Sequence, residues 1–198
     1  MPATAPHAPP RLWLDFINTE LPPSGVDELA SFDAYVTWLE RAGIVDPDRA
    51  STIRRRAVLQ PAGATAALLE ARRMRTALRA LAEQASGTRT SDEFALGELN
   101  RVLGRSAGMR RVERRADGAY IRSFVAAGDA FAGLLLPLVE SATDSLVRGE
   151  LNRVRLCANP RCGRVFYDGT RNASRRWCAM GTCGNREKAA KYRKTRRR

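Results

Sequence analysis

Apolar positions recur at helical spacing through most of the first 150 residues. The first clear stripe follows Ser31, a good N-cap, and stops before Gly43. Its apolar members are Phe32, Tyr35, Val36, Leu39 and Ala42. Asp46 followed by Pro47 is typical of a helix start, and the helix that it predicts ends before Pro61.

Two more helices follow in the same half of the chain. Thr65–Ala85 is rich in Ala, Leu and Arg and is closed by Gly87, and Ser91 is the expected cap of a helix over Asp92–Leu103. We interpret the apolar stripes as core packing. The arginines at 54–56 and at 72, 73 and 75 are interpreted as solvated helix faces.

The periodicity changes near residue 109. Asp117 and Gly118 lie between two short runs and favour the positive backbone angles of a tight turn, so we predict a β-hairpin at about 109–124. A helix returns over residues 128–147, and Pro137 is expected to kink or split it.

These patterns divide the chain into three segments. Residues 1–10 are rich in Pro and Ala and are expected to be a flexible tail. Residues 11–150 predict a mostly helical domain with one β-hairpin, and Gly149 marks its end. Residues 151–198 form a small C-terminal module, so the expected fold class is mostly α.

The charge of the protein lies in that last module. The whole chain carries a net charge of +13, and residues 151–198 hold 15 Lys and Arg against 2 Asp and Glu. The remainder is neutral, so the module alone accounts for the excess. Such asymmetry indicates a basic module that meets a polyanion, attached to a neutral domain.

No targeting segment is visible in the sequence. The opening residues lack the apolar run of a signal peptide, and the longest apolar stretch, Ala132–Val139, is too short to cross a bilayer. We therefore expect a cytoplasmic protein with no membrane partner. Thiols stay reduced there, so clustered cysteines are expected to bind a metal before they form disulfides.

Four cysteines stand in two matched pairs. Cys157 and Cys162 form one C-x4-C-G unit, and Cys178 and Cys183 form another fifteen residues later. We expect each following glycine to turn the chain tightly, so that backbone N–H groups point at sulfur. One structural Zn²⁺ held by four thiolates fits this pattern best. Disulfides, a catalytic zinc site and an Fe–S cluster are the alternatives.

The order of elements around the cysteines is also readable. Two short strands, RVRLC and RVFYD, flank the first pair, and the second pair opens into a helix that Asn185 is expected to cap. This is the order of a treble-clef-like zinc finger. Trp177 is interpreted as part of its small core, whereas Phe166 and Tyr167 alternate, one inward and one outward.

Two segments of the sequence resemble known families. The segment Cys157–Arg193, with its CGNR tetrapeptide at Cys183–Arg186, resembles the CGNR zinc finger of bacterial proteins. The earlier LDFINT segment, Leu14–Thr19, is similar to the opening of the helical ABATE domain that precedes that finger. The resemblance implies a DNA-binding finger in a stress-induced transcription regulator.

We therefore expect a DNA-binding transcription regulator, because Lys and Arg supply the salt-dependent attraction to phosphate. The candidate nucleic-acid contacts are Arg171, Arg175, Arg176, Asn185, Arg186, Lys188, Lys191, Arg193 and Lys194. RNA binding is the main alternative, since composition does not separate the two nucleic acids. A solvated basic tail is a further one.

The helical domain has less specific expectations. Sensing of an unknown small-molecule effector and formation of a homodimer both suit a helical domain joined to a DNA reader. Asp15 and Asn18 are the candidate ligand-binding residues, and a pocket around them is the best case for an enzyme. We expect no enzyme, because residues 11–150 contain no nucleotide-binding fingerprint or hydrolase motif.

Overall fold

A computed structural model describes residues 11–88, 93–105, 108–114, 118, 120–127 and 131–196. The predicted flexible tail, residues 1–10, lies outside this part, and so does the predicted cap Ser91. The seven α-helices in the described part are α1 (Leu12–Ile17), α2 (Phe32–Arg41), α3 (Pro47–Leu59), α4 (Pro61–Ala85), α5 (Glu93–Arg105), α6 (Leu136–Val147) and α7 (Asn185–Thr195).

The strands form three antiparallel pairs. They are β1 (Glu20–Leu21) with β2 (Val26–Asp27), β3 (Gly108–Arg114) with β4 (Tyr120–Ala126), and β5 (Val154–Leu156) with β6 (Val165–Tyr167). Three single-turn segments, η1 (Pro22–Ser24), η2 (Glu150–Arg153) and the π-helical η3 (Met180–Gly184), complete the described elements. The expected mostly α fold with small hairpins is confirmed.

Local capping chemistry places the first long helices. The Ser31 hydroxyl accepts a hydrogen bond from the backbone N–H of Ala34 at 3.1 Å at the start of α2. At the start of α3, the Asp46 carboxylate accepts one from the N–H of Arg49 at 2.7 Å. Each cap satisfies a donor that has no partner within its helix, so these two helix starts were readable from the sequence.

Two predicted features differ from the structure. Pro137 neither kinks nor splits a helix, because α6 begins at Leu136 and the proline lies in its first turn, where its missing N–H removes no helical hydrogen bond. The region 11–150 also contains a second hairpin, β1–β2, joined by η1. Its two-residue strands are too short to give an alternating pattern.

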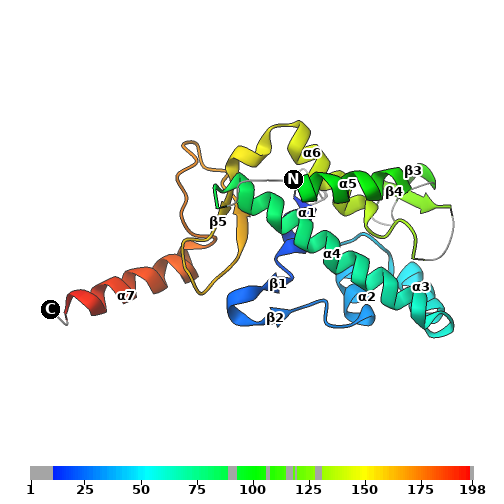
Figure 1. Cartoon of the computed structure of the whole chain (residues 1–198), viewed down its shortest axis with the longest axis horizontal. Helices are drawn as coiled ribbons and strands as arrows, with labels where there is room; N and C mark the ends of the chain where they lie inside the picture. Colours follow the sequence, from blue (N-terminus) through cyan, green and yellow to red (C-terminus); the bar gives the residue numbers. More distant parts are fainter. Residues whose placement is uncertain are drawn as a thin grey trace.

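The core is built around the long helix α4, which crosses the middle of the view in Figure 1. Trp13, Phe16 and Ile17 of α1 are fully buried against it and its neighbours. Val154 of β5 and Val165 of β6 belong to the same buried cluster. The C-terminal module thus shares a core with the helical region, and the division near residue 150 stays a prediction.

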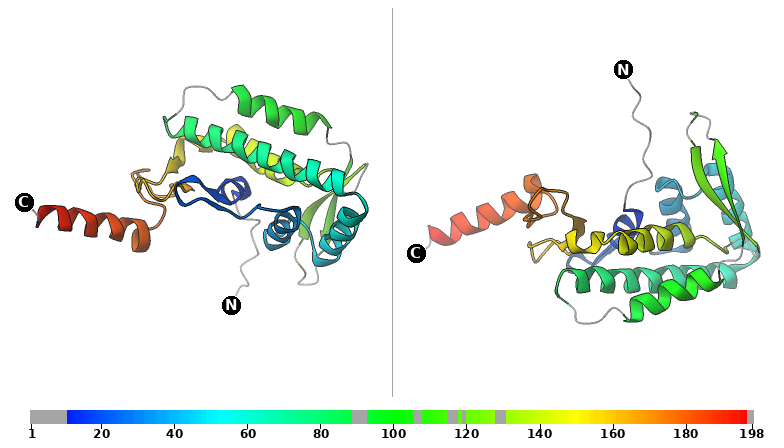
Figure 2. Two further views of the ribbon diagram at one scale, coloured as in Figure 1. Left: turned by 60° about the horizontal axis from the view of Figure 1, so that its bottom comes forward. Right: turned by 90° about the horizontal axis from the view of Figure 1, so that it is seen from above.

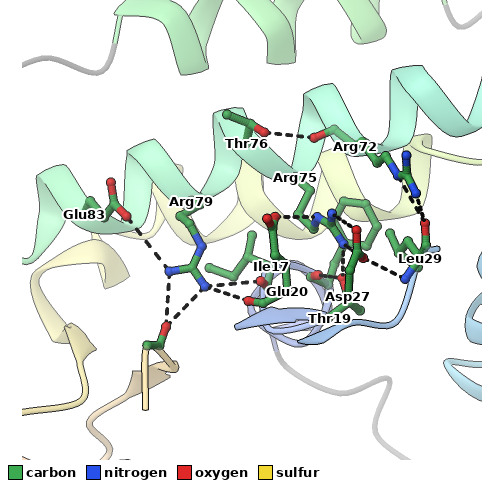
Figure 3. Close-up of polar contacts among 12 residues, drawn as sticks. Ile17, Thr19, Glu20, Asp27, Leu29, Arg72, Arg75, Thr76, Arg79 and Glu83 are labelled. Carbon is green, nitrogen blue, oxygen red and sulfur yellow. Dashed lines mark hydrogen bonds and ion pairs between the residues drawn. The ribbon is translucent and has the colours of Figure 1, made fainter. Parts of the chain in front are cut away.

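Two of the three α4 arginines expected on a solvated face, Arg72 and Arg75, instead contact the β1–β2 hairpin and the residues that follow it, whereas Arg73 is exposed. Arg75 is 3% exposed, and its two Nη atoms lie 2.6 and 3.0 Å from the carboxylate of Asp27. Its Nε lies 3.2 Å from the Glu20 carboxylate. Arg72 donates to the carbonyl oxygen of Leu29. Figure 3 shows Arg75 reaching from α4 to Glu20 of β1 and Asp27 of β2, and Arg72 reaching to Leu29 after β2.

Further elements are joined by ion pairs across helices. Glu98 of α5 accepts hydrogen bonds from Arg73 of α4 and from Arg101 of its own helix, at 2.6 to 3.0 Å. Burial raises the pKa of Glu98, but these two guanidinium partners outweigh it and hold the pKa below its usual value.

In the described part, no helix is long and apolar enough to cross a membrane.

Arg75 is the residue whose loss should cost the helical region most. We expect Arg75→Ala to lower the free energy of unfolding by about 3 kcal/mol, the low end for breaking a buried ion pair, because Glu20 and Asp27 are partly exposed. Arg54→Ala is the matched control: Arg54 pairs with Asp33 and Glu40 at the surface, and its loss should cost about 1 kcal/mol or less. Urea unfolding measures both.

The acid dependence of unfolding gives a second readout of the same pair. The hydrogen bonds from Arg75 hold the pKa of Asp27 below its ordinary value. A carboxylate with a lowered folded pKa contributes stability above its unfolded pKa of about 3.9, and this contribution is lost as the pH falls through the folded value. Arg75→Ala should therefore flatten the loss of stability below pH 4. An unchanged dependence of stability on pH below 4 would contradict the conclusion that Arg75 lowers the pKa of Asp27.

Candidate metal centre and nucleic-acid interface

The first cysteine pair lies in a turn between β5 and β6. Asn159 is 7% exposed, and its side-chain oxygen accepts a hydrogen bond from the N–H of Arg161 at 3.0 Å. The N–H of Cys162 donates to the Asn159 carbonyl at 2.9 Å. Gly163 then adopts a φ of +64°, which glycine tolerates best, and returns the chain to β6. The predicted tight turn is therefore present here.

Asp168 organises the loop between the two pairs. The side chain is fully buried, and one carboxylate oxygen accepts from the N–H and the hydroxyl of Thr170 at 2.9 and 2.5 Å. The other oxygen accepts from the N–H of Arg175 at 2.6 Å. Burial raises the pKa of Asp168, but the hydrogen bonds outweigh it and leave the pKa below its ordinary value. The sequence alone assigned Asp168 no role, because its partners are recognisable only in the folded loop.

The second pair is built differently from the first. Cys183 lies in the π-helical segment η3, which continues directly into α7. Gly184 has a helical φ of −63°, so the expected tight turn is wrong here. A Cβ at Gly184 would lie 2.7 Å from the sulfur of Met180, so glycine here leaves room for that flexible side chain. Asn185 is not an N-cap: it begins the helix and donates to the Gly181 carbonyl at 3.2 Å.

The two pairs bring four sulfur atoms together. All four Sγ atoms, those of Cys157, Cys162, Cys178 and Cys183, lie within 4.8 Å of one another. Cys162 and Cys178 are 3.6 Å apart, and Cys178 and Cys183 are 3.7 Å apart. A tetrahedral Zn²⁺ with bonds of about 2.3 Å to sulfur requires sulfur–sulfur distances of about 3.8 Å. The residues present therefore fit the ion.

The surroundings of the sulfurs favour a cation among them. Burial and the neighbouring sulfurs raise the pKa of the Cys178 thiol far above its ordinary value. Burial also raises the pKa of Cys162, and a hydrogen bond from the backbone N–H of Arg164 partly offsets this. Several thiolates crowded in this way repel one another, and Zn²⁺ supplies the compensating charge.

A small apolar cluster encloses the metal site. Phe166 is 8% exposed and packs with Cys157 and Cys183, and Trp177 lies against the same cluster. The predicted alternation along β6 is present, but Tyr167 does not face solvent. It packs against the core of the helical region, and the guanidinium of Arg11 lies 3.1 Å from its ring centroid.

These features define a class of protein: a helical domain joined to a finger built on a four-cysteine zinc site. Family comparison agrees in both parts. The chain belongs to the ABATE family, described as "Putative stress-induced transcription regulator", whose model matches residues 10–149. The CGNR zinc finger model matches residues 153–197, and the four clustered cysteines are its zinc-binding site. A comparison with curated proteins gave no match.

The candidate nucleic-acid contacts lie in the loop and on α7. Arg171, Arg176, Asn185, Arg186, Lys188 and Arg193 have exposed side chains, and Lys191 and Lys194 lie along α7. Arg175 differs from these because its Nε donates to the Trp177 carbonyl at 2.9 Å and its Nη2 donates to the carbonyl of Cys178. Much of its donor capacity therefore stabilises the backbone at the second cysteine pair.

The candidate ligand residues lie between the helical region and the finger. Asp15 and Asn18 border a cavity of about 390 Å³ together with Trp38, Arg41 and Arg164. Desolvation raises the pKa of Asp15, against the opposing charge of Arg164. The amide of Asn18 is already bonded to the backbone of β6. Ligand binding at these two residues stays a prediction.

The two glycines that follow the cysteine pairs should differ in importance. A Cβ at Gly163 would lie 2.5 Å from Cδ of Pro23, a rigid ring atom, at a positive φ. We expect Gly163→Ala to cost about 2–4 kcal/mol of finger stability, which is roughly thirtyfold or more in zinc affinity. A Cβ at Gly184 would be too close only to the flexible side chain of Met180, with Trp177 at an ordinary contact distance of 3.6 Å, so Gly184→Ala should cost less than about 1 kcal/mol.

Competition for zinc with a chromophoric chelator measures both variants. The two substitutions add the same methyl group at equivalent positions of the C-x4-C-G units, so each is the control for the other. Equal losses of zinc affinity would show that the two glycines have the same role, contrary to the geometry.

Proposed function

We propose that the protein is a DNA-binding transcription regulator whose finger and helix α7 contact the phosphate backbone. The observation that carries the proposal is the solvent exposure of α7. Every side chain described on this helix is exposed, including Ala189, Ala190 and Tyr192. In Figures 1 and 2 the helix extends away from the rest of the molecule.

A helix of this kind has no stabilising face of its own. Its 11 residues are fewer than an isolated helix needs for stability in water, and its first turn is continuous with η3. Glu187 is its one acidic residue, against Arg186, Lys188 and Arg193 among the exposed basic ones. Phosphate contacts would neutralise this charge and stabilise the helix.

The arrangement also suggests which residues would meet bases. Asn185 and Arg186 begin α7 beside the metal site, and Arg176 lies in the adjoining loop with its guanidinium carbon 5.3 Å from the Trp177 ring centroid. Arg and Asn are the side chains that read guanine and adenine edges in the major groove. Residues further along α7 suit contacts with phosphate.

We also propose that the chain acts by binding, not catalysis. Four thiolates fill the tetrahedral positions of Zn²⁺, whereas a catalytic zinc keeps one position for water or substrate. The zinc therefore has a structural role: it holds the loop and α7 in a fixed relation.

Salt dependence of binding tests the phosphate contacts. Each contact contributes about −0.9 to the slope of log affinity against log salt on duplex DNA. Lys188→Ala and Lys191→Ala should each flatten the slope by about one unit on any duplex. Arg186→Ala should in addition cost roughly 1–3 kcal/mol at a preferred site if it reads a guanine. Fluorescence anisotropy on a selected and a random duplex measures both effects.

The matched control is Arg148→Ala. Arg148 is an exposed arginine of the helical region that pairs with Asp144, far from α7 in sequence, and its loss should leave the slope unchanged. Unchanged slopes in the α7 variants would contradict the proposal. Equal or tighter binding to structured RNA of the same length would favour RNA as the target.

A further inference from the structure

The ABATE motif LDFINT contains a residue that contacts the zinc finger. Asn18 is 7% exposed, and its Nδ2 donates to the carbonyl of Val165 at 2.8 Å. The N–H of Val165 donates back to Oδ1 of Asn18 at 2.9 Å. The side-chain amide thus makes the two hydrogen bonds that a neighbouring strand would make with β6.

Arg79 of α4 contacts the same short segment. Both of its Nη atoms lie 3.2 Å from the carbonyl oxygen of Gly163, and Nη2 also donates to the Glu20 carbonyl at 3.0 Å. Figure 3 shows this side chain between α4 and the β1 strand, with a further contact to Glu83. One arginine therefore joins α4, β1 and the turn after Cys162.

The η1 turn completes the contact. Its prolines lie so close to Gly163 that a Cβ there would be 2.5 Å from Pro23 and 3.6 Å from Pro22. The helical region therefore surrounds the backbone of residues 163–165 by a hydrogen-bonded amide, a guanidinium and a rigid apolar surface. None of these contacts involves α7 or the basic loop.

The position of this segment gives the contact a consequence for the metal. Gly163 directly follows the ligand Cys162, and the N–H of Arg164 is hydrogen-bonded to the Cys162 sulfur. The carbonyl of Arg164 accepts from the N–H of Cys157 at 2.9 Å. Fixing residues 163–165 therefore fixes both sulfurs of the first cysteine pair.

We propose that Asn18 and Arg79 are positioning residues of the zinc centre, so that zinc binding and the folding of the helical domain are thermodynamically coupled. The proposal concerns the metal site and does not depend on nucleic-acid binding. Coupling of this kind is reciprocal. A folded helical domain tightens zinc binding, and bound zinc stabilises the helical domain.

Two matched pairs of variants of the full-length protein test the proposal. Asn18→Ala removes the amide that holds Val165, whereas the adjacent Thr19→Ala removes a buried hydroxyl that bonds only within the helical region, to Phe16 and Arg75. Arg79→Lys removes the two-pronged contact with Gly163. Arg72→Lys, two turns away on α4, changes only contacts with Leu29 and Ala30.

The readouts are zinc affinity by chelator competition and the unfolding midpoint of helical circular dichroism with and without zinc. Asn18→Ala and Arg79→Lys should weaken zinc binding roughly ten- to a hundredfold. They should also shrink the zinc-dependent shift of the midpoint, whereas both controls keep wild-type zinc affinity. The Arg79 and Arg72 pair decides the question if Asn18→Ala does not fold. The proposal would be overturned if each variant and its control bound zinc equally well. It would also be overturned if the unfolding midpoint of the wild-type protein were the same with and without zinc.

Discussion

Four sulfur atoms that meet within 4.8 Å are the constraint on which the C-terminal part of this protein depends. Ionised thiols at that spacing require a divalent cation, and the ion in turn fixes two segments that have little apolar surface of their own. The finger has one fully buried loop anchor, Asp168, and a small cluster around Phe166 and Trp177. Metal binding supplies the folding free energy that so small a core lacks.

The metal site does not stand alone, because its hairpin is part of a larger core. Val154 and Val165 are buried with residues of α1 and α4, and Tyr167 packs there too. Two arginines of α4 stabilise this junction, the contact between the helical region and the β5–β6 hairpin. Arg75 holds the β1–β2 hairpin through Asp27, and Arg79 extends the contact to Gly163. The helix α7 is then the one long element that remains without a packed face among the described residues, which suits it for a partner outside the chain.

Much of this arrangement was readable from local sequence. The cysteine spacing indicated the zinc site, the caps Ser31 and Asp46 indicated two helix starts, and Asp117-Gly118 indicated the β3–β4 hairpin. The caps and the Asp-Gly turn depend on residues within a few positions of one another, and each cysteine pair is equally local. Short-range hydrogen bonding and turn preferences decide them, so the distant parts of the chain do not change the outcome.

Several features that were missed depend on partners far away in sequence. Asn18 bonds a residue 147 positions later, and Arg75 pairs with Asp27, 48 positions earlier. A run of arginines on a helix gives no local sign that one of them is buried. Gly163 and Gly184 look equivalent in sequence, but one turns the chain against Pro23 and the other makes room for Met180.

The most direct test of the account is native-state hydrogen exchange of the full-length protein with zinc bound and after chelation. The account predicts that chelation speeds exchange in the finger and also in β1–β2 and α1, including the N–H of Glu28, which bonds the Thr19 carbonyl at 2.8 Å. Helices α2 and α3, away from the junction, should change least. Faster exchange confined to residues 157–195, with α1 and β1–β2 unaffected, would contradict the claim that zinc site and helical domain form one coupled structure.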